Sequence, residues 1–222
     1  MMMGRRDLLA LLAVAAPLGG GRAQTATGRR GESDLWFDPT QLPSFTGTVE
    51  RYLPNPRGET DALIFREGPQ IVFPPDVAEA VQRDAPRGRS IIVWGIRARS
   101  APVITMLAFA PSSDATPVVV DRFYWRLGGR LPQAEGTSLQ FSGTVKQPYY
   151  TPQGEVAGAI LEDGSVILVP AEAAKGAADL LKAGQSLAAA GPGRESSEGR
   201  ALLADRIGPA LESMRPLAGP AR

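Results

Sequence analysis

The chain has 222 residues, of which 43% are hydrophobic, and 24 basic residues against 23 acidic ones leave a net charge of +1. It contains no histidine and no cysteine, which excludes disulfides, thiolate metal sites and catalysis by imidazole or thiol groups. The near-neutral charge weighs against nucleic acid as the main partner, because binding to a phosphate backbone depends on an excess of Lys and Arg.

Residues 1–23 have the pattern of an export signal. A short basic start is followed by an apolar stretch from Leu8 to Leu18 and by small residues that lead to a cleavage site after Ala23. The start resembles the twin-arginine signal, which carries folded proteins, at Arg5, Arg6, Leu8 and Leu9. An ordinary secretory signal with two arginines is the alternative. Either route predicts a periplasmic or secreted protein with no stable membrane anchor after cleavage.

A polar lead-in covers residues 24–44. Trp36 and Phe37 interrupt it, and we expect them to pack onto the domain that follows.

Two parts of the chain repeat one another. Residues 45–108 align with residues 141–204 at a constant offset of 96, without a gap. Both copies begin Phe-x-Gly-Thr-Val and continue with Pro-x-Gly-Glu, an acidic residue before glycine, and a proline. A unit of this length is too long for a solenoid repeat, so the pattern predicts two duplicated small domains, at residues 45–110 and 141–208.

Each copy predicts the order strand, strand, strand, helix, strand, strand. Alternating apolar positions and turn residues place the strands of the first copy at 45–53, 60–65, 70–73, 90–98 and 103–110. The strands of the second copy fall at 141–148, 156–161, 166–169, 186–190 and 202–207, with a helix at 171–181. The strand signal is weakest at 186–190, and Gly191-Pro192-Gly193 directly after it predicts a turn.

This element order resembles the OB-fold, a five-stranded barrel with a helix between its third and fourth strands. The resemblance covers both copies, and the Pro-x-Gly-Glu, Asp-Gly and Pro pattern is also similar to that of a group of exported bacterial proteins. The sequence therefore predicts an all-β protein with short helices, built from two duplicated OB-fold-like barrels. A pair of small SH3-like or other β-barrels is the alternative.

Two further segments flank the second copy. In the spacer, residues 111–140, the run from Val118 to Trp125 predicts a strand that covers an open barrel edge or the seam between the barrels. Residues 209–222 form a C-terminal tail that is either a short docked helix or a loose segment.

The residue types predict a binding protein and not an enzyme. No serine lies in a recognisable nucleophile context, no loop has the regular oxygen spacing of a calcium site, and no glycine-rich stretch has the setting of a phosphate loop. We therefore expect no catalytic residue, no cofactor and no metal.

The OB-fold resemblance implies ligand contacts on strands two and three and on the loops that join strands one to two and four to five. The candidate binding residues on these loops are Tyr52, Asn55, Arg57, Arg97, Arg99, Tyr149, Tyr150 and Gln153. The tyrosine rings could stack on bases or sugars, or they could close the barrel end or pack between the copies. The second copy has Gly193 and Glu195 at the positions of the arginine pair, so an arginine-based site would belong to the first copy alone.

Together these features predict an exported, non-enzymatic interaction protein whose partner is a protein or an envelope polymer. The alternative is an oligonucleotide-binding protein, which the fold resemblance suggests and the charge disfavours. The third interpretation is an enzyme with a Ser–Lys or paired-carboxylate site. The duplication also allows the second copy simply to stabilise the first.

Overall fold

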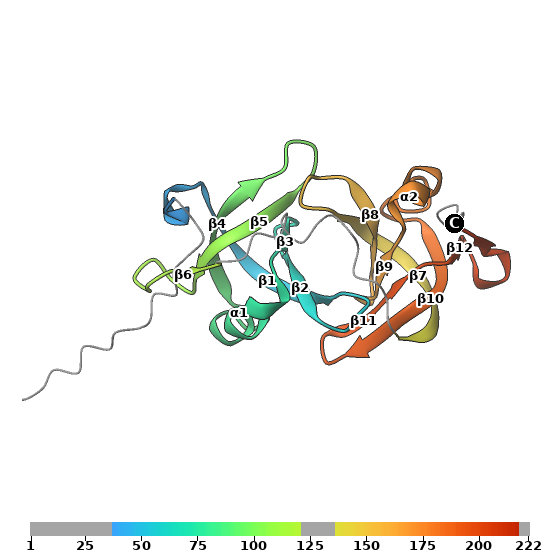
Figure 1. Cartoon of the computed structure of the whole chain (residues 1–222), viewed down its shortest axis with the longest axis horizontal. Helices are drawn as coiled ribbons and strands as arrows, with labels where there is room; N and C mark the ends of the chain where they lie inside the picture. The colour runs from blue at the N-terminus through green and yellow to red at the C-terminus, as the bar shows by residue number, and fades with distance from the viewer. Residues whose placement is uncertain (1–36, 121–135, 218–222) are drawn as a thin grey trace, which may run out of the picture. The chain divides into compact units, whose positions relative to one another are not determined.

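The computed structural model describes residues 37–120 and 136–217, all within one compact unit of the chain (Figure 1). The predicted export signal, Trp36 and the end of the predicted spacer strand lie outside the described residues.

Five strands close the first barrel: β1 (Ser44–Pro54), β2 (Thr60–Phe65), β3 (Gln70–Val72), β4 (Ser90–Arg97) and β5 (Val103–Ala110). β1 pairs antiparallel with both β2 and β4, and a parallel pairing of β3 with β5 closes the ring. A 3₁₀ turn (Pro75–Val77) and helix α1 (Ala78–Asp84) lie between β3 and β4. This connectivity is that of the OB-fold, so the predicted fold class is confirmed.

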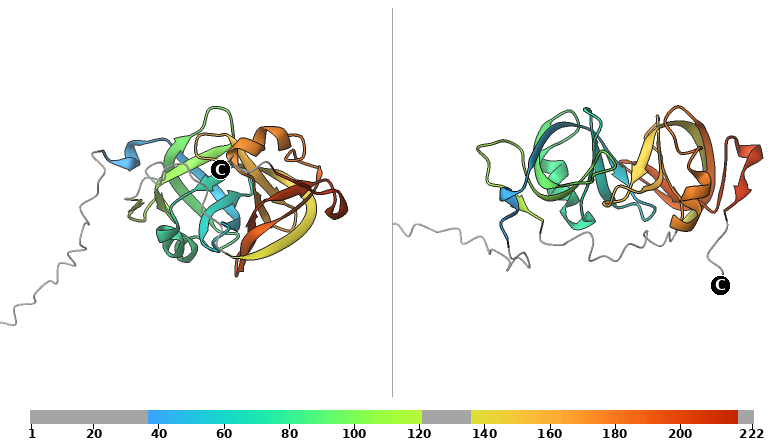
Figure 2. Two further views of the ribbon diagram at one scale, coloured as in Figure 1. Left: turned by 45° about the vertical axis from the view of Figure 1, so that its right-hand side comes forward. Right: turned by 90° about the horizontal axis from the view of Figure 1, so that it is seen from above.

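The second barrel repeats this plan with β7 (Thr137–Tyr150), β8 (Val156–Leu161), β9 (Val166–Leu168), helix α2 (Ala171–Ala177), β10 (Ser186–Ser196) and β11 (Gly199–Leu203). β7 pairs with β8 and β10, and the parallel pairing of β9 with β11 closes the ring. Each sheet curls round on itself in the further views of Figure 2.

Shorter elements extend the two sheets. β6 (Val118–Val119) pairs with β5, so the predicted spacer strand covers an edge of the first barrel as far as the structure describes it. β12 (Arg206–Gly208) pairs with β10, and β13 (Arg215–Pro216) pairs with β12. The tail, for which a short docked helix and a loose segment were the two predictions, forms a 3₁₀ turn at Leu211–Ser213. A 3₁₀ turn at Pro39–Gln41 packs beside β4.

The predicted turn at Gly191-Pro192-Gly193 is wrong. These residues continue β10, opposite Leu139, Ser138 and Thr137 of β7. A Cβ atom at Gly191 would lie 2.0 Å from the carbonyl oxygen of Leu203. Glycine is needed there because the backbone of β11 crosses β10 at close range, and not because the chain turns. The predicted helix at 171–181 is also shorter in the structure, where α2 ends at Ala177.

The first strand of each barrel carries a bulge at the same place. The register of β1 against β2 skips Glu50, and the register of β7 against β8 skips Lys146. On one side of the bulge each strand pairs with the fourth strand of its barrel, and on the other side with the second. The bulge therefore gives the bend that lets one strand close the barrel.

The described residues form three apolar clusters, one inside each barrel and one between them. In β2, Leu63 and Phe65 belong to the interior cluster of the first barrel, whereas Ala62 and Ile64 belong to the cluster between the barrels. β2 is thus buried on both sides, which explains its continuous apolar run. β8 is divided between the second interior and the same shared cluster.

The repeated glycine of the Phe-x-Gly-Thr-Val motif makes room for a large side chain of the second strand. A Cβ atom at Gly47 would lie 2.1 Å from the ring of Phe65, which is buried in the first barrel. The equivalent atom at Gly143 would lie 3.2 Å from the side chain of Leu161. The motif is therefore a packing requirement, stricter in the first copy than in the second.

This difference predicts unequal effects of the same substitution. Gly47→Ala should destabilise the protein by about 1–3 kcal/mol, because the Phe65 ring has to move within a filled core. Gly143→Ala should be near neutral, since a stiffer unfolded chain offsets the tighter contact by about 0.4–1 kcal/mol. Urea unfolding of both variants measures the two values, and equal losses would contradict the packing argument.

Candidate functional site

The faces on which OB barrels bind ligands are buried against each other here. The shared cluster contains Leu53, Ala62, Ile64, Val72, Ala101 and Val103 of the first copy and Tyr149, Ala157, Ile160, Val166, Leu168 and Ala201 of the second. Most of these residues lie on the outer sides of β1 to β3 and β7 to β9. The second and third strands of each barrel therefore pack on the other barrel, in the position that a ligand would take in an OB-fold.

The loops beside these strands are also in contact. A Cβ atom at Gly154, in the β7–β8 loop, would lie 3.0 Å from the Cβ of Ala98, next to β4. A Cβ atom at Gly58, in the β1–β2 loop, would lie 3.4 Å from the Cβ of Arg194 in β10. Each first loop thus rests on the fourth strand of the other barrel or the residues just after it.

Polar contacts bridge the same interface. The buried side chain of Gln70 accepts a hydrogen bond from the backbone N–H of Tyr150 at 2.9 Å and donates one to its carbonyl at 3.1 Å. Glu50 pairs with Lys146, and Arg87 pairs with Glu198. Because the Gln70 amide is fully buried, loss of this pairing would leave polar groups without partners.

The three tyrosines predicted to contact a ligand lie in apolar surroundings. Tyr52 belongs to the first interior cluster, and its hydroxyl donates to the carbonyls of Ala85 at 2.6 Å and Val81 at 3.1 Å. Tyr149 belongs to the shared cluster and Tyr150 packs against it. Tyr52 thus ties β1 to the end of α1, while the other two take the alternative position between the copies. A binding role for these rings stays a prediction.

The remaining loop residues divide into a structural and an exposed group. Asn55 is buried, and its side-chain oxygen accepts the backbone N–H groups of Arg57 at 2.9 Å and Glu59 at 3.2 Å. Its amide nitrogen donates to Asp61 at 3.1 Å, so Asn55 organises the β1–β2 loop. Arg57 and Gln153 are exposed.

Arg97 and Arg99, by contrast, lie at an open surface. Residues 97–102, which join β4 to β5, line a shallow hollow of about 490 Å³ at the rim of the shared cluster. Both guanidinium groups are on exposed residues, and neither makes an ion pair with another described residue. Ile96, next to Arg97, is 49% exposed. The lining of the hollow therefore includes two cations, whereas Ile96 lies on the opposite side of β4 from Arg97.

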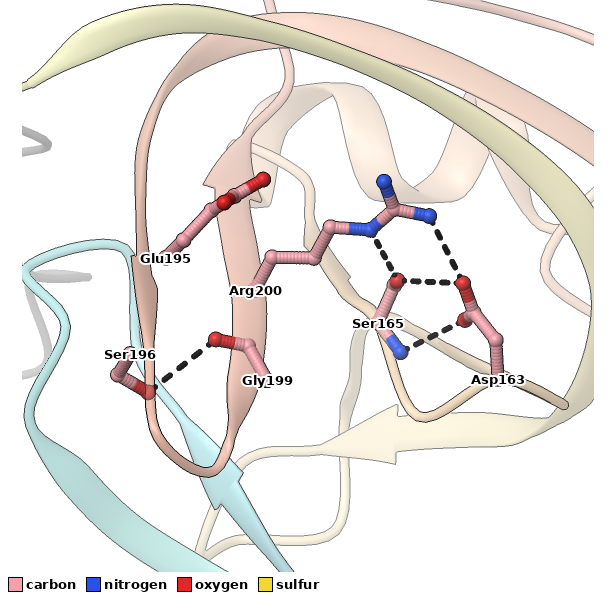
Figure 3. Close-up of a pocket in the computed structure, with 6 residues that line it drawn as sticks. All are labelled: Asp163, Ser165, Glu195, Ser196, Gly199 and Arg200. Atoms are coloured by element: carbon pink, nitrogen blue, oxygen red, sulfur yellow. Dashed lines mark hydrogen bonds and ion pairs between the residues drawn. The ribbon is translucent and has the colours of Figure 1, made fainter.

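At the equivalent end of the second barrel, the charged side chains bind one another within that barrel. A hollow of about 250 Å³ is lined there by Asp163, Ser165, Glu195, Ser196, Gly199 and Arg200 (Figure 3). Arg200 reaches from β11 to donate to Ser165 Oγ and Asp163 Oδ2, both at 2.8 Å. Ser165 donates its hydroxyl to Asp163 at 2.9 Å, and the Arg200 guanidinium also lies over the Phe141 ring at 4.6 Å.

This cluster of Asp163, Ser165 and Arg200 is poorly suited to catalysis. Burial alone would raise the pKa of Asp163, but hydrogen bonds from the amide and hydroxyl of Ser165 and from Arg200 outweigh it and lower that pKa. A carboxylate with a lowered pKa is a weak base, and it could not efficiently activate the buried Ser165 hydroxyl. The contacts instead hold the β8–β9 turn against β11.

Two other kinds of site are not seen in residues 37–120 and 136–217. These ranges hold no group of three side chains that could bind a metal ion. Neither of their α-helices has the length and hydrophobicity that a membrane span requires.

Comparison with known proteins adds little to this geometry. No family model matches the chain, and no curated protein matches it. The wild-type single-stranded DNA-binding protein from Thermus aquaticus is 16% identical over 81% of this chain and 94% of that chain, with a TM-score of 0.24. A deletion mutant of the same protein is 17% identical over 78% and 95%, also with a TM-score of 0.24. At these TM-scores the likeness carries no argument, so the fold rests on strand pairing and the site on its own contacts.

Sequence reasoning missed Ile96 and Gln70. Ile96 lies on the less buried side of β4 with Ile92 and Trp94, as the alternation of that strand indicates. Gln70 had a detectable signal, because a glutamine opens the third strand of the first copy where the second copy has Val166.

The surroundings of Tyr52 predict an alkaline loss of stability. Burial, and to a smaller extent the charge of Glu198, raises the pKa of Tyr52. The folded protein therefore holds the phenol proton more tightly than the unfolded chain, in which tyrosine ionises near pH 10. This contribution is fully present below about pH 10 and is lost as the pH rises further.

Tyr52→Phe should lower the free energy of unfolding by about 1 kcal/mol at neutral pH, because the Ala85 and Val81 carbonyls lose a donor. The variant should also lose less stability than the wild type above pH 10. Urea unfolding from pH 7 to 11 measures both effects, and parallel pH profiles would show that Tyr52 is not the group responsible.

Proposed function

We propose that the protein is an exported, non-enzymatic binding protein that contacts its partner through the residues joining β4 to β5 in the first barrel. The observation that carries this proposal is the burial of the β2–β3 and β8–β9 faces against each other, which leaves the hollow beside Arg97 and Arg99 as the open part of the OB-type ligand region.

The chemistry of this hollow fits a protein partner. Arginine is enriched in the centres of protein interfaces, where its guanidinium group binds carboxylates in a bidentate geometry. Ala98, Ala101 and Pro102 line the same hollow and add apolar contact area beside the two cations. The favoured partner therefore presents acidic groups next to an apolar side chain. An acidic envelope polymer would contact the arginines but would make little use of the apolar residues.

The absence of histidine and cysteine from the whole chain supports a non-enzymatic role. The described acid–hydroxyl cluster at Ser165 is tied into hairpin contacts and has no base suited to neutral pH. Export is supported by the pattern of residues 1–23.

Charge reversal in the hollow tests the proposal. The double variant Arg97→Glu, Arg99→Glu should retain less than a tenth of the partner captured by the immobilised wild-type protein from an envelope extract, because two attractive contacts become repulsive. The double variant Arg66→Glu, Arg89→Glu changes the net charge equally at two other exposed arginines of the same barrel and should bind like the wild type.

Pro102→Ser separates the two kinds of partner, since it should weaken capture of a protein and leave an acidic polymer bound. Equal capture by the Arg97/Arg99 variant and the control would contradict the proposed site. Fluorescence anisotropy with labelled single-stranded DNA tests the oligonucleotide alternative. DNA binding that survives reversal of Arg97 and Arg99 but is weakened by Tyr150→Ala would favour that alternative.

A further inference from the structure

The interface between the barrels brings equivalent positions of the two copies together. Glu50 and Lys146, which are 96 residues apart and occupy the same place in the repeat, contact each other. Ile64 and Ile160, also equivalent, lie in the same shared cluster. The loop contact described above is made in both directions as well, once by each copy. An interface in which both partners present the same patch is the isologous interface of a twofold dimer.

The charge at the centre of this patch differs between the copies. Glu50 and Lys146 are the bulge residues of β1 and β7, and each is only about a quarter exposed. If two first copies met through this face, two carboxylates would oppose each other, and two second copies would oppose two ammonium groups. Only the pairing of a first with a second copy places opposite charges together.

The buried amide contact has the same selectivity. Gln70 pairs with the backbone of Tyr150, whose counterpart in the first copy is Pro54. Proline has no N–H, so Gln70 could not form both bonds with another first copy. The counterpart of Gln70 is Val166, which would leave the Tyr150 backbone without this partner when two second copies meet.

We propose that the outer sides of β1 to β3 and of β7 to β9 form a self-recognition surface, whose partner is the same surface of the other copy. Glu50, Lys146, Gln70 and Tyr150 restrict it to pairs that contain one first and one second copy. A second chain of this protein is therefore the partner that the surface fits, through reciprocal exchange of barrels. Two like copies would bring like charges and unpaired polar groups together, and such unfavourable contacts give an interface specificity.

A charge-reversal cycle in the full chain tests the restriction. Glu50→Lys and Lys146→Glu should each lower the melting temperature by roughly 2–4 °C or more, as expected for loss of one contact in a protein of this size. The double variant should recover most of that loss, because the opposite charges are restored in exchanged positions. The same cycle at the exposed pair Asp179 and Lys182 is the matched control. Each single charge reversal there should change the melting temperature little, so the double variant has no loss to recover. Additive losses at Glu50 and Lys146 would overturn the assignment.

Mixing the two single variants tests recognition of a second chain. Both should be monomers when refolded alone. In Glu50→Lys every pairing of a first with a second copy opposes two lysines, and in Lys146→Glu every such pairing opposes two glutamates. When the two are unfolded together in urea and refolded by dilution at high concentration, they should form a 1:1 dimer. Exchange of barrels then restores both opposite-charge contacts.

Size-exclusion chromatography with light scattering measures the mass, and labels on one variant report composition. A mixture that stays monomeric, or one that dimerises no more than either variant alone, would overturn the proposal.

Discussion

The apolar surface shared by the two barrels is the constraint on which the rest of the structure depends. Each barrel has a small interior, and domains of this size are marginally stable alone because they bury a small fraction of their surface. The shared cluster adds a second buried side to β2 and to β8. At this interface Gln70 makes hydrogen bonds to both the N–H and the carbonyl of Tyr150, so the contact includes a specific polar element that a purely apolar surface would lack.

This pairing decides where a ligand can bind. It covers the strands that an OB-fold ordinarily offers and draws the β1–β2 and β7–β8 loops into contact with the opposite barrel. The ends of the barrels at the β4–β5 and β10–β11 connections remain open. There the copies have diverged. The first has exposed Arg97 and Arg99, whereas in the second Arg200 is bound to Ser165 and Asp163. The first barrel thus has arginines without ion pairs to other described residues at this end, whereas the arginine at the equivalent end of the second barrel is bound within its own barrel.

The repeat made the fold predictable from sequence, because both copies had to be compatible with the same order of strands and helix. The element order, the spacer strand at Val118–Val119 and the hairpin turns all follow from alternation and from turn residues. The turn predicted at Gly191-Pro192-Gly193 was wrong because close approach between strands requires glycine as strongly as a turn does. Local pattern cannot distinguish the two causes.

The site was less predictable, because burial against a second barrel is not a local property. The sequence allowed the loop tyrosines either a ligand or a packing role, and the shared cluster and the Gln70 hydrogen bonds place Tyr149 and Tyr150 beside the other copy. One signal of the interface was present in the sequence. The second strands, Ala62 to Phe65 and Val156 to Leu161, are apolar on both faces, as a strand covered on both sides requires.

Native-state hydrogen exchange of the wild-type protein in sub-denaturing urea tests the central claim, that the two barrels stabilise each other as one unit. If the barrels stabilise each other, the Tyr150 amide and the slowest amides of both barrels should exchange only by global unfolding, with one common free energy and urea dependence. Exchange of one barrel through its own opening, at a lower free energy and with the other barrel still protected, would contradict it.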